Sequence, residues 1–265
     1  MTKFLKRFYA ILILLFLYLP MITLVVLSFN SSKSRAKWGG FSFIWYRNLF
    51  HDSEIMKVLL TTLLVAFVSA VVACFIGTIA AIGMNKMKPF TRSALMGVTN
   101  IPMLNADIVT GISLMLLFLI LKDKFGFRFG IVSILLSHIT FNIPYVILSV
   151  MPRIKKMNPS NYEAALDLGA TPVYAFFKVI LPDIWPGVLS GFLMAFTMSL
   201  DDFIITYFTK GSGVDTLSTK IYAMVKKGVN PEMYALSTLI FVSVLILLIL
   251  INTLPSGGKS KKAEK

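Results

Sequence analysis

The sequence has little cysteine, histidine or charge. Cys74 is the only cysteine and lies in an apolar run, so the chain forms no internal disulfide, and a lone thiol cannot build a metal site. Neither His51 nor His138 stands in a nucleophile or metal-ligating pattern. Charged residues make up only 14% of the chain and lie between the apolar runs. These shortages exclude a disulfide-stabilised secreted domain and a soluble domain with one core.

Motifs for nucleotide binding and hydrolysis are also absent. The chain has no G-x-x-x-x-G-K-[ST], so it cannot hold ATP with a phosphate-binding loop. It has no H-E-x-x-H or G-x-S-x-G either. We therefore expect no catalytic residue, no cofactor and no metal site, and energy for any work has to come from another subunit.

The net charge of +14 does not indicate a nucleic-acid partner. Lys and Arg are spread over every loop between apolar runs, without a basic face or a recognition motif around them. This distribution favours contact with anionic lipid headgroups. We therefore expect a lipid bilayer, and no nucleic acid, among the partners.

Long apolar runs dominate what is present. The hydrophobic fraction is 57% and the mean hydropathy is +0.80. Crossing about 30 Å of hydrocarbon takes about 20 apolar residues in a helix. The sequence predicts an all-α membrane protein with one transmembrane domain over residues 1–265. Its six spans are expected at about 8–29, 58–84, 93–121, 129–151, 184–208 and 235–254.

Six spans place both termini on the same side of the membrane. Lys and Arg are divided almost equally between the two sets of loops, so the positive-inside rule alone does not fix the orientation. The leader residues Lys3, Lys6 and Arg7 and the basic tail "KSKKAEK" favour cytoplasmic N- and C-termini.

Three apolar runs contain polar residues at depth. They are "NIPMLNAD", "SHITFNIP" and "SLDD". Such groups cost a few kcal/mol unless they face protein or water, which favours a helix bundle around a cavity. For His138 and the polar patch that it forms with Ser137, Thr140 and Asn142, we expect hydrogen bonds between helices.

The loop at 153–182 is predicted to form two short helices joined at Gly169. Ser160 and Glu163 fit a capping box at the start of the first helix, and Gly169 is a natural residue just past its end. Thr171 is expected to cap the second helix, and Pro182 to end it.

Glu163 and Asp167 lie four residues apart, on one face of the first helix. Like charges at this spacing are mildly destabilising, so the pair suits a cationic partner. Ala164 and Ala165 beside them allow a partner surface to approach closely. A docking helix and an ordinary surface helix both fit this pattern.

The stretch "EAALDLGATPVYAFFKVILP" resembles the EAA loop of ABC-importer permeases, EAA-x3-G-x9-I-x-LP, with Val179 in place of isoleucine. In that family the loop is the coupling helix, which inserts into a groove of a cytoplasmic ATPase. The resemblance implies that the loop at 153–182 and both termini are cytoplasmic. The implied coupling residues are Glu163, Ala164, Ala165, Asp167, Gly169, Leu181 and Pro182.

Other segments, from "SFNSS" to "KIYAMVKKGVNPEMYALST", resemble the second permease subunit of spermidine/putrescine ABC importers over nearly the whole chain. The resemblance implies the type I ABC importer permease fold in the bacterial cytoplasmic membrane. It also implies a polyamine substrate, a second homologous permease, two cytoplasmic ATPase subunits and an extracytoplasmic polyamine-binding protein.

A cationic substrate draws attention to the acids inside the spans. If spans 93–121 and 184–208 are regular helices running outward, Asp107 and Asp201 lie at similar depth. Two carboxylates at one level suit the ammonium groups of an extended polyamine, and aromatic rings nearby add cation–π contacts. The candidate substrate path comprises Asp107, Asp201, Asp202, Tyr207 and Phe208.

Two alternatives stay open at this point. One is an ABC importer permease for another small organic cation or a metal ion, because the same acids suit those substrates. The other is a proton- or sodium-coupled carrier or channel. Inverted repeats between the two halves would favour the second alternative, and the sequence shows none. A membrane-bound enzyme has the least support.

Overall fold

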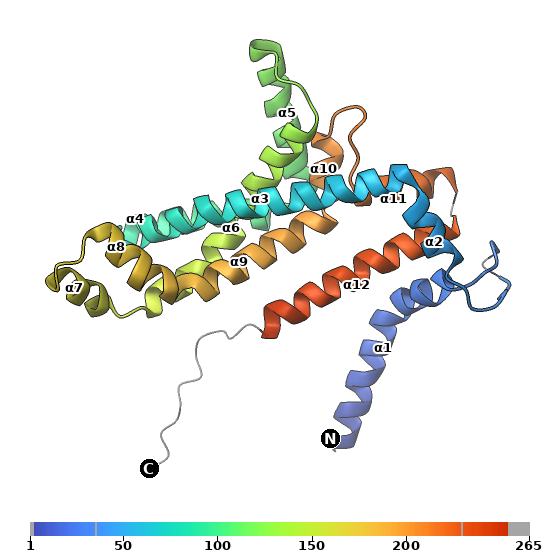
Figure 1. Cartoon of the computed structure of the whole chain (residues 1–265), viewed down its shortest axis with the longest axis horizontal. Coiled ribbons are helices and arrows are strands. Elements are labelled where there is room, and N and C mark those ends of the chain that lie inside the picture. Colours follow the sequence, from blue (N-terminus) through green and yellow to red (C-terminus); the bar gives the residue numbers. More distant parts are fainter. Residues whose placement is uncertain (1–2, 35, 229, 254–265) are drawn as a thin grey trace. The chain divides into compact units, whose positions relative to one another are not determined.

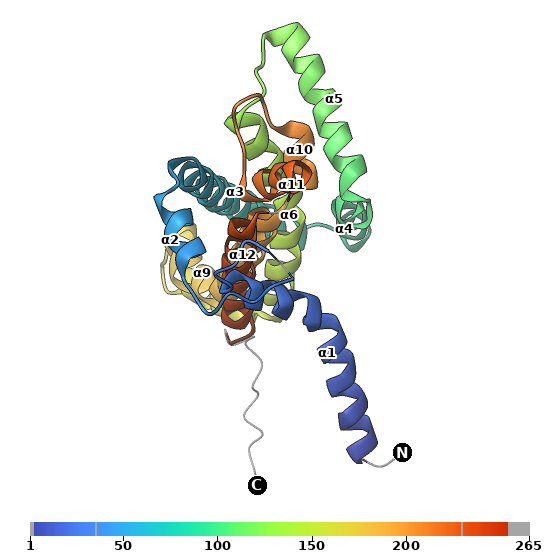
Figure 2. The same cartoon turned by 90° about the vertical axis from the view of Figure 1, so that its right-hand side faces the viewer.

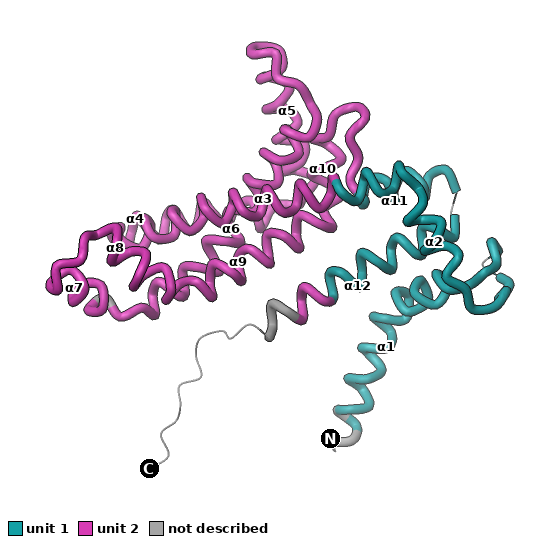
Figure 3. Tube along the Cα trace, in the orientation of Figure 1, with its two compact units in different colours: residues 1–60, 217–245 teal, residues 61–216, 246–265 magenta. Residues whose placement is uncertain are grey.

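The computed structural model describes residues 3–34, 36–228 and 230–253. Within these residues the regular structure is helical, and the only strand-like pairing is an isolated bridge between Asn30 and Phe41. The chain divides into two compact units (Figure 3), residues 1–60 with 217–245 and residues 61–216 with 246–265. The tail at 254–265, which entered the orientation argument, lies outside the described residues.

The first unit contains α1 (Lys3–Ser28), α2 (Ile44–His51), the start of α3 (Ser53–Asn85), α11 (Leu217–Lys227) and most of α12 (Pro231–Thr253). Its apolar core gathers residues from α2, α3, α11 and α12, among them Trp45, Leu49, Val58, Leu217 and Leu236. Almost every described side chain along α1 is exposed, as expected for a helix whose solvent is lipid.

The second unit contains the rest of α3, then α4 (Pro89–Leu104), α5 (Asp107–Phe125), α6 (Ile131–Lys156) and α7 (Pro159–Asp167). It continues through α8 (Pro172–Ala175), a π-helical turn (Phe176–Ile180), α9 (Leu181–Asp201) and α10 (Ile204–Thr209). Figures 1 and 2 show α6 and α9 side by side. The core of this unit lies between α3, α6 and α9.

Glycines let these three helices approach closely. A Cβ at Gly77 of α3 would lie 2.8 Å from the Val146 side chain, and one at Gly187 of α9 would lie 3.0 Å from the Ser149 carbonyl oxygen. Small residues at helix crossings are a common device in membranes, where van der Waals packing holds helices together. The closely packed helices α6 and α9, called the α6–α9 frame below, therefore support the residues that follow α9.

Among the described residues, five helices are long and apolar enough to cross a membrane, and α4 with α5 gives a sixth span if the two count as one. The continuous helix predicted at 93–121 is wrong, because α4 and α5 meet at a bend of 100° at Asn105 and Ala106. Pro102 precedes the bend. The depth calculation for Asp107, which assumed a straight helix, fails with it.

The fifth predicted span also has different limits. The helix that begins at Pro172 runs without a large bend to Asp201, and α10 starts only after a break at Asp202 and Phe203. A regular helix through 184–208 is therefore wrong. Asp201 and Asp202 are not two positions on one helix but the end of one helix and the start of a turn.

Candidate functional site

The first candidate region is the helical hairpin α7–α8. Its first helix begins with Asn158, whose side chain accepts a hydrogen bond from the Ser160 backbone N–H at 3.1 Å. Pro159 occupies the first helical position, where its missing N–H costs nothing. The predicted capping box at Ser160 and Glu163 is therefore wrong, because Asn158 followed by proline starts the helix two residues earlier.

The end of α7 confirms the predicted role of Gly169. Gly169 has φ +87°, a backbone conformation that glycine adopts without steric cost. Its N–H donates to the Leu166 carbonyl at 2.9 Å, and the Ala170 N–H donates to the Ala165 carbonyl at 3.0 Å. These two bonds form a Schellman motif. The motif leaves the Leu168 side chain 89% exposed.

The second arm of the hairpin starts as predicted but does not end as predicted. The Thr171 hydroxyl accepts a hydrogen bond from the Tyr174 N–H at 3.3 Å, and Pro172 follows at the first helical position. Pro182, however, lies in the first turn of α9 and ends nothing. The π-helical turn just before it shifts the hydrogen-bond register, so the missing N–H of proline is tolerated.

Four of the predicted coupling residues, Ala164, Ala165, Gly169 and Pro182, line two open hollows on this hairpin. One, of about 530 Å³, is lined by residues that include Ala165, Gly169 and Tyr174. The other, of about 560 Å³, is lined by residues that include Ala164, Ala165 and Pro182. Leu168 borders both hollows. Leu181, another predicted coupling residue, is half-buried.

The two acids of the hairpin remain uncompensated. Glu163 and Asp167 are exposed, and neither forms an ion pair with any residue that the structure describes. The hairpin thus presents two carboxylates, an exposed leucine and two shallow hollows on one short segment. Such a combination has the chemistry of a contact surface for another protein.

The second candidate region is the break between α9 and α10. Asp202 Oδ2 accepts hydrogen bonds from the Thr206 backbone N–H at 2.8 Å and from its hydroxyl at 2.7 Å. Asp202 Oδ1 accepts one from the Ile205 N–H at 3.3 Å. Asp202 therefore caps α10, which is why the chain can leave α9 and begin a new helix within three residues.

His138 on α6 completes this break. Its ring is fully buried, with Nδ1 2.5 Å from the Ser199 hydroxyl and Nε2 2.8 Å from the Thr206 hydroxyl and 3.4 Å from Asp202 Oδ2. Ser199 is also 3.2 Å from the Ser69 hydroxyl of α3. The hydrogen bonds predicted between helices are confirmed for His138.

The same prediction is wrong for Ser137, Thr140 and Asn142, which form no hydrogen bond to another helix within the described residues. Ser137 and Thr140 donate to carbonyls within α6, and both polar atoms of the buried Asn142 amide lack a hydrogen-bond partner. The contact between His138 Nε2 and Asp202 Oδ2 was missed by the sequence analysis. His138 and Asp202 are far apart in sequence, and no local pattern links them.

Asp201 differs from its neighbour. It is the last residue of α9, is exposed, and its side chain forms no ion pair within the part of the chain that is described. Tyr207 is 42% exposed, with its ring centroid 5.4 Å from that of Phe203 and 5.6 Å from that of Phe208. An unpaired carboxylate and an exposed phenol ring therefore flank the break.

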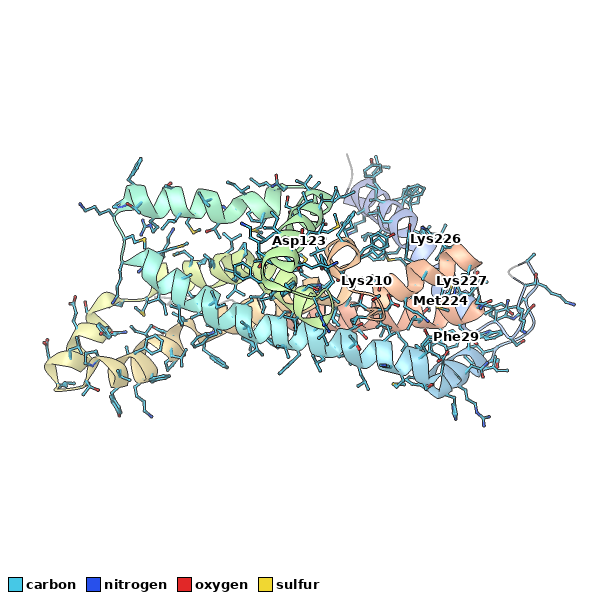
Figure 4. All side chains as sticks on the ribbon, turned by 90° about the horizontal axis from the view of Figure 1, so that it is seen from above. Phe29, Asp123, Lys210, Met224, Lys226 and Lys227 are labelled. Atoms are coloured by element: carbon cyan, nitrogen blue, oxygen red, sulfur yellow. The ribbon has the colours of Figure 1, made fainter. Side chains whose placement is uncertain are left out.

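Asp107, the third predicted acid, lies at the start of a helix that packs on α10, a contact that the sequence did not reveal. Asp107 is exposed and opens α5. One turn later, a Cβ at Gly111 would lie 3.1 Å from the Phe208 ring and 3.5 Å from the Ile204 carbonyl oxygen. The first turns of α5 thus pack on α10, and Phe208 lies in that contact. In Figure 4 Asp123 is labelled in the last turn of α5 and Lys210 just beyond α10.

Comparison with known proteins places this geometry in a family. Residues 73–257 match the family described as "Binding-protein-dependent transport system inner membrane component". The Putrescine transport system permease protein PotI of Escherichia coli (strain K12) is 42% identical over 85% of this chain and 81% of its own length. The Spermidine/putrescine transport system permease protein PotC of Haemophilus influenzae is 36% identical over 93% and 95%.

Solved structures show the same fold at low sequence identity. The crystal structure of a bacterial ABC transporter involved in the import of the acidic polysaccharide alginate aligns with 94% of this chain and 96% of its own, with a TM-score of 0.67 and 20% identity. The MetNI methionine ABC transporter aligns with 76% and 96%, with a TM-score of 0.59 and 18% identity. The chain therefore belongs to the family of binding-protein-dependent transport system inner membrane components, as a multi-span permease subunit of an ABC importer and not an enzyme.

Proposed function

We propose that the chain is a permease subunit of an ATP-driven importer for polyamines, in which it forms half of the translocation path. The observation that carries the choice of substrate is the exposed, unpaired carboxylate of Asp201 beside the break between α9 and α10. Relatives that are putrescine and spermidine/putrescine permeases support the same choice.

Polyamine chemistry fits this region. Asp107 opens the helix that packs on α10, so it brings a second exposed carboxylate toward the break. An extended chain with two or more ammonium groups can pair with carboxylates contributed by different helices. The exposed ring of Tyr207 offers a cation–π contact. An anionic substrate would be repelled by the same residues.

For the hairpin we propose docking into a cytoplasmic ATPase, with both termini of the chain on the cytoplasmic side of the bacterial cell membrane. The complete importer then contains a second homologous permease, two ATPase subunits and an extracytoplasmic polyamine-binding protein. The exposed Leu168 and the uncompensated Glu163 and Asp167 support this docking. A partner surface would bury the leucine and could pair with the two carboxylates.

The helix from Pro172 to Asp201 supplies the mechanical connection. It contains 30 residues, which corresponds to about 45 Å at 1.5 Å per residue. One of its ends is the hairpin and the other is the break with Asp201. In the proposed cycle, ATP binding closes the two ATPases and moves the hairpins. The bundle then opens outward and accepts a polyamine, and hydrolysis reverses the movement.

The substrate assignment is tested by uptake of labelled putrescine and spermidine in cells expressing the complete importer. Asp201→Asn and Asp107→Asn are expected to lower uptake, because each removes one carboxylate from the region of the break. Asp123→Asn is the matched control, since it changes an exposed acid in the last turn of α5. Normal uptake by the Asp201→Asn/Asp107→Asn double variant contradicts the proposed path.

The docking assignment needs a separate measurement. Glu163→Ala is expected to reduce both ATPase co-purification and uptake, because an exposed acid has little role in holding the hairpin itself. Asp123→Ala, which removes an exposed acid from the last turn of α5, is the control. Unchanged co-purification and uptake in Glu163→Ala remove the docking role.

A further inference from the structure

The adjacent acids Asp201 and Asp202 have opposite surroundings. Asp201 is exposed and forms no ion pair with a described residue. Both oxygens of Asp202 are occupied, and its side chain is only 9% exposed. Two identical side chains at consecutive positions are thus in different chemical situations. The difference calls for a division of roles between them.

The hydrogen-bond directions around Asp202 follow from which groups can donate. An ionised carboxylate only accepts, so the single hydroxyl hydrogen of Thr206 points to Asp202 Oδ2. The Thr206 oxygen must then accept from His138 Nε2, 2.8 Å away. The network therefore assigns a proton to Nε2 of His138, on the side that also faces Asp202.

The other side of the ring is equally engaged. His138 Nδ1 lies at the Ser199 hydroxyl, and Ser199 lies at Ser69. The ring is 0% exposed, so it cannot exchange these partners for water. One side chain of α6 is therefore linked to α3, α9 and α10 at once. Its removal takes one buried partner from each of Ser199, Thr206 and Asp202, so we expect it to destabilise the break.

The backbone explains what this network holds in place. Asp202 has φ −59° and ψ 125°, outside the helical region, so α9 stops at Asp201. The Asp202 carboxylate then caps the first free N–H groups of α10. Without this cap, two helical segments with apolar sequences would have little reason to break here, and the two acids would point about 100° apart on one helix.

We propose that His138 is a positioning residue for the substrate path. By binding Asp202 it fixes the break between α9 and α10, so that Asp202 has a structural role and Asp201 is the acid of the pair that meets the cationic substrate. The role of Asp201 rests on the proposed function. The pair between His138 and Asp202 stands without it.

The pair is tested first by stability, in the assembled importer. His138→Leu and Asp202→Asn are each expected to lower its Tm, and the double variant to lower it by less than the sum of the two single losses, because either change alone already removes the contact between the two side chains. His138→Gln, which retains an N–H donor, is expected to restore part of the loss. Additive losses in the double variant overturn the pair.

Two matched variants locate the effect. Asp201→Asn makes the same chemical change one residue away and is expected to leave Tm unchanged. Asn142→Leu removes a buried polar side chain one turn along α6 that has no hydrogen-bond partner, so it is expected to cost less stability than His138→Leu. A Tm loss in Asp201→Asn as large as that in Asp202→Asn overturns the division of roles.

Transport kinetics distinguish a positioning role of His138 from a purely structural one, because a purely structural role would not change the half-saturating polyamine concentration. Per assembled complex, Asp201→Asn is expected to raise the half-saturating polyamine concentration roughly tenfold, the worth of one charge-assisted contact. His138→Leu is expected to raise it as well, because Asp201 is no longer held in position. An unchanged half-saturating concentration in His138→Leu, with only the amount of complex reduced, overturns the positioning role.

The proposed function and the pair of His138 and Asp202 can be contradicted independently of each other. If the unmodified importer carries no polyamine, the assignment of Asp201 is overturned together with the proposed function, while the stability cycle still decides the pair of His138 and Asp202. If polyamines are carried and the cycle shows no coupling, the pair is overturned and the proposed function stands.

Discussion

The hairpin α7–α8 and the break between α9 and α10 use similar parts for different purposes. Each is a place where one helix ends and another begins, and each carries two acids close in sequence. At the hairpin both acids are exposed, and Leu168 beside them is 89% exposed. At the break both oxygens of Asp202 accept hydrogen bonds from Ile205 and Thr206, and the His138 ring lies against Oδ2.

This difference separates a surface that requires a partner from a site that is complete in itself. The hairpin satisfies its backbone locally, through a cap and a Schellman motif, but not its side chains. The break depends on contacts between four helices. We therefore expect changes at the hairpin to affect association and changes around the break to affect folding.

The largest loss of stability is expected from crowding the α6–α9 frame that supports the break. In Gly187→Val the new Cβ would lie 2.7 Å from Arg153 Cγ and 3.0 Å from the Ser149 carbonyl oxygen. Overpacking of this kind costs about 1–3 kcal/mol. Gly83→Val is the control, because nothing lies within 4 Å of a Cβ there. Equal Tm values for the two variants would show that the frame is not closely packed.

The next largest effect concerns the hairpin surface. Leu168→Ser is expected to weaken ATPase binding roughly tenfold, as loss of a central apolar contact does, and to leave the Tm of the chain unchanged. The measurement is the amount of ATPase retained by the tagged permease at increasing dilution. Leu104→Ser, at a leucine that is 85% exposed at the end of α4, is the control. If Leu168→Ser lowers the Tm of the chain and Leu104→Ser does not, Leu168 packs within the chain and the prediction is contradicted.

A smaller effect tests the backbone of the hairpin. Gly169→Ala is expected to cost about 1 kcal/mol, because φ +87° is unfavourable for a residue with a Cβ. Gly97→Ala in α4, where a Cβ meets nothing within 4 Å, is expected to stabilise by about as much. Opposite shifts in hydrogen exchange around the two sites would confirm the prediction, and shifts of the same sign would contradict it.

The smallest effect distinguishes the observed cap from the one predicted by sequence. Asn158→Ala is expected to destabilise α7 by about 1 kcal/mol, visible as faster proteolysis within 158–168. Ser160→Ala is expected to change little, because the Ser160 N–H and not its hydroxyl takes part in the cap. Faster proteolysis in Ser160→Ala alone would reinstate the capping box.

The hairpin was largely predictable because its structure is local. Gly169, Thr171 and Pro172 each determine the conformation of their own neighbourhood, so the bend and the second start were predicted correctly. The first cap was misplaced by two residues, because Asn158 and Ser160 are both good capping residues and the sequence alone did not rank them. The end at Pro182 was wrong, because a π-helical turn absorbs the proline.

The break and the bend were not predictable in the same way. "SLDD" reads as the interior of a helix, and the partner of Asp202 lies 64 residues earlier on α6, so its choice depends on how α6, α9 and α10 pack. The 100° bend between α4 and α5 lies in a run whose hydropathy is that of a single span.

The sequence by itself determined that the chain crosses a membrane with helices, where most of those helices lie, and that a capped hairpin divides two of them, because apolar length and local backbone chemistry decide these features. The tertiary structure alone decided which acid is buried and which is free. A carboxylate is satisfied only by donors that lie close to it, and the folded bundle, not the order of residues, brings His138 Nε2 to 3.4 Å from Asp202 Oδ2.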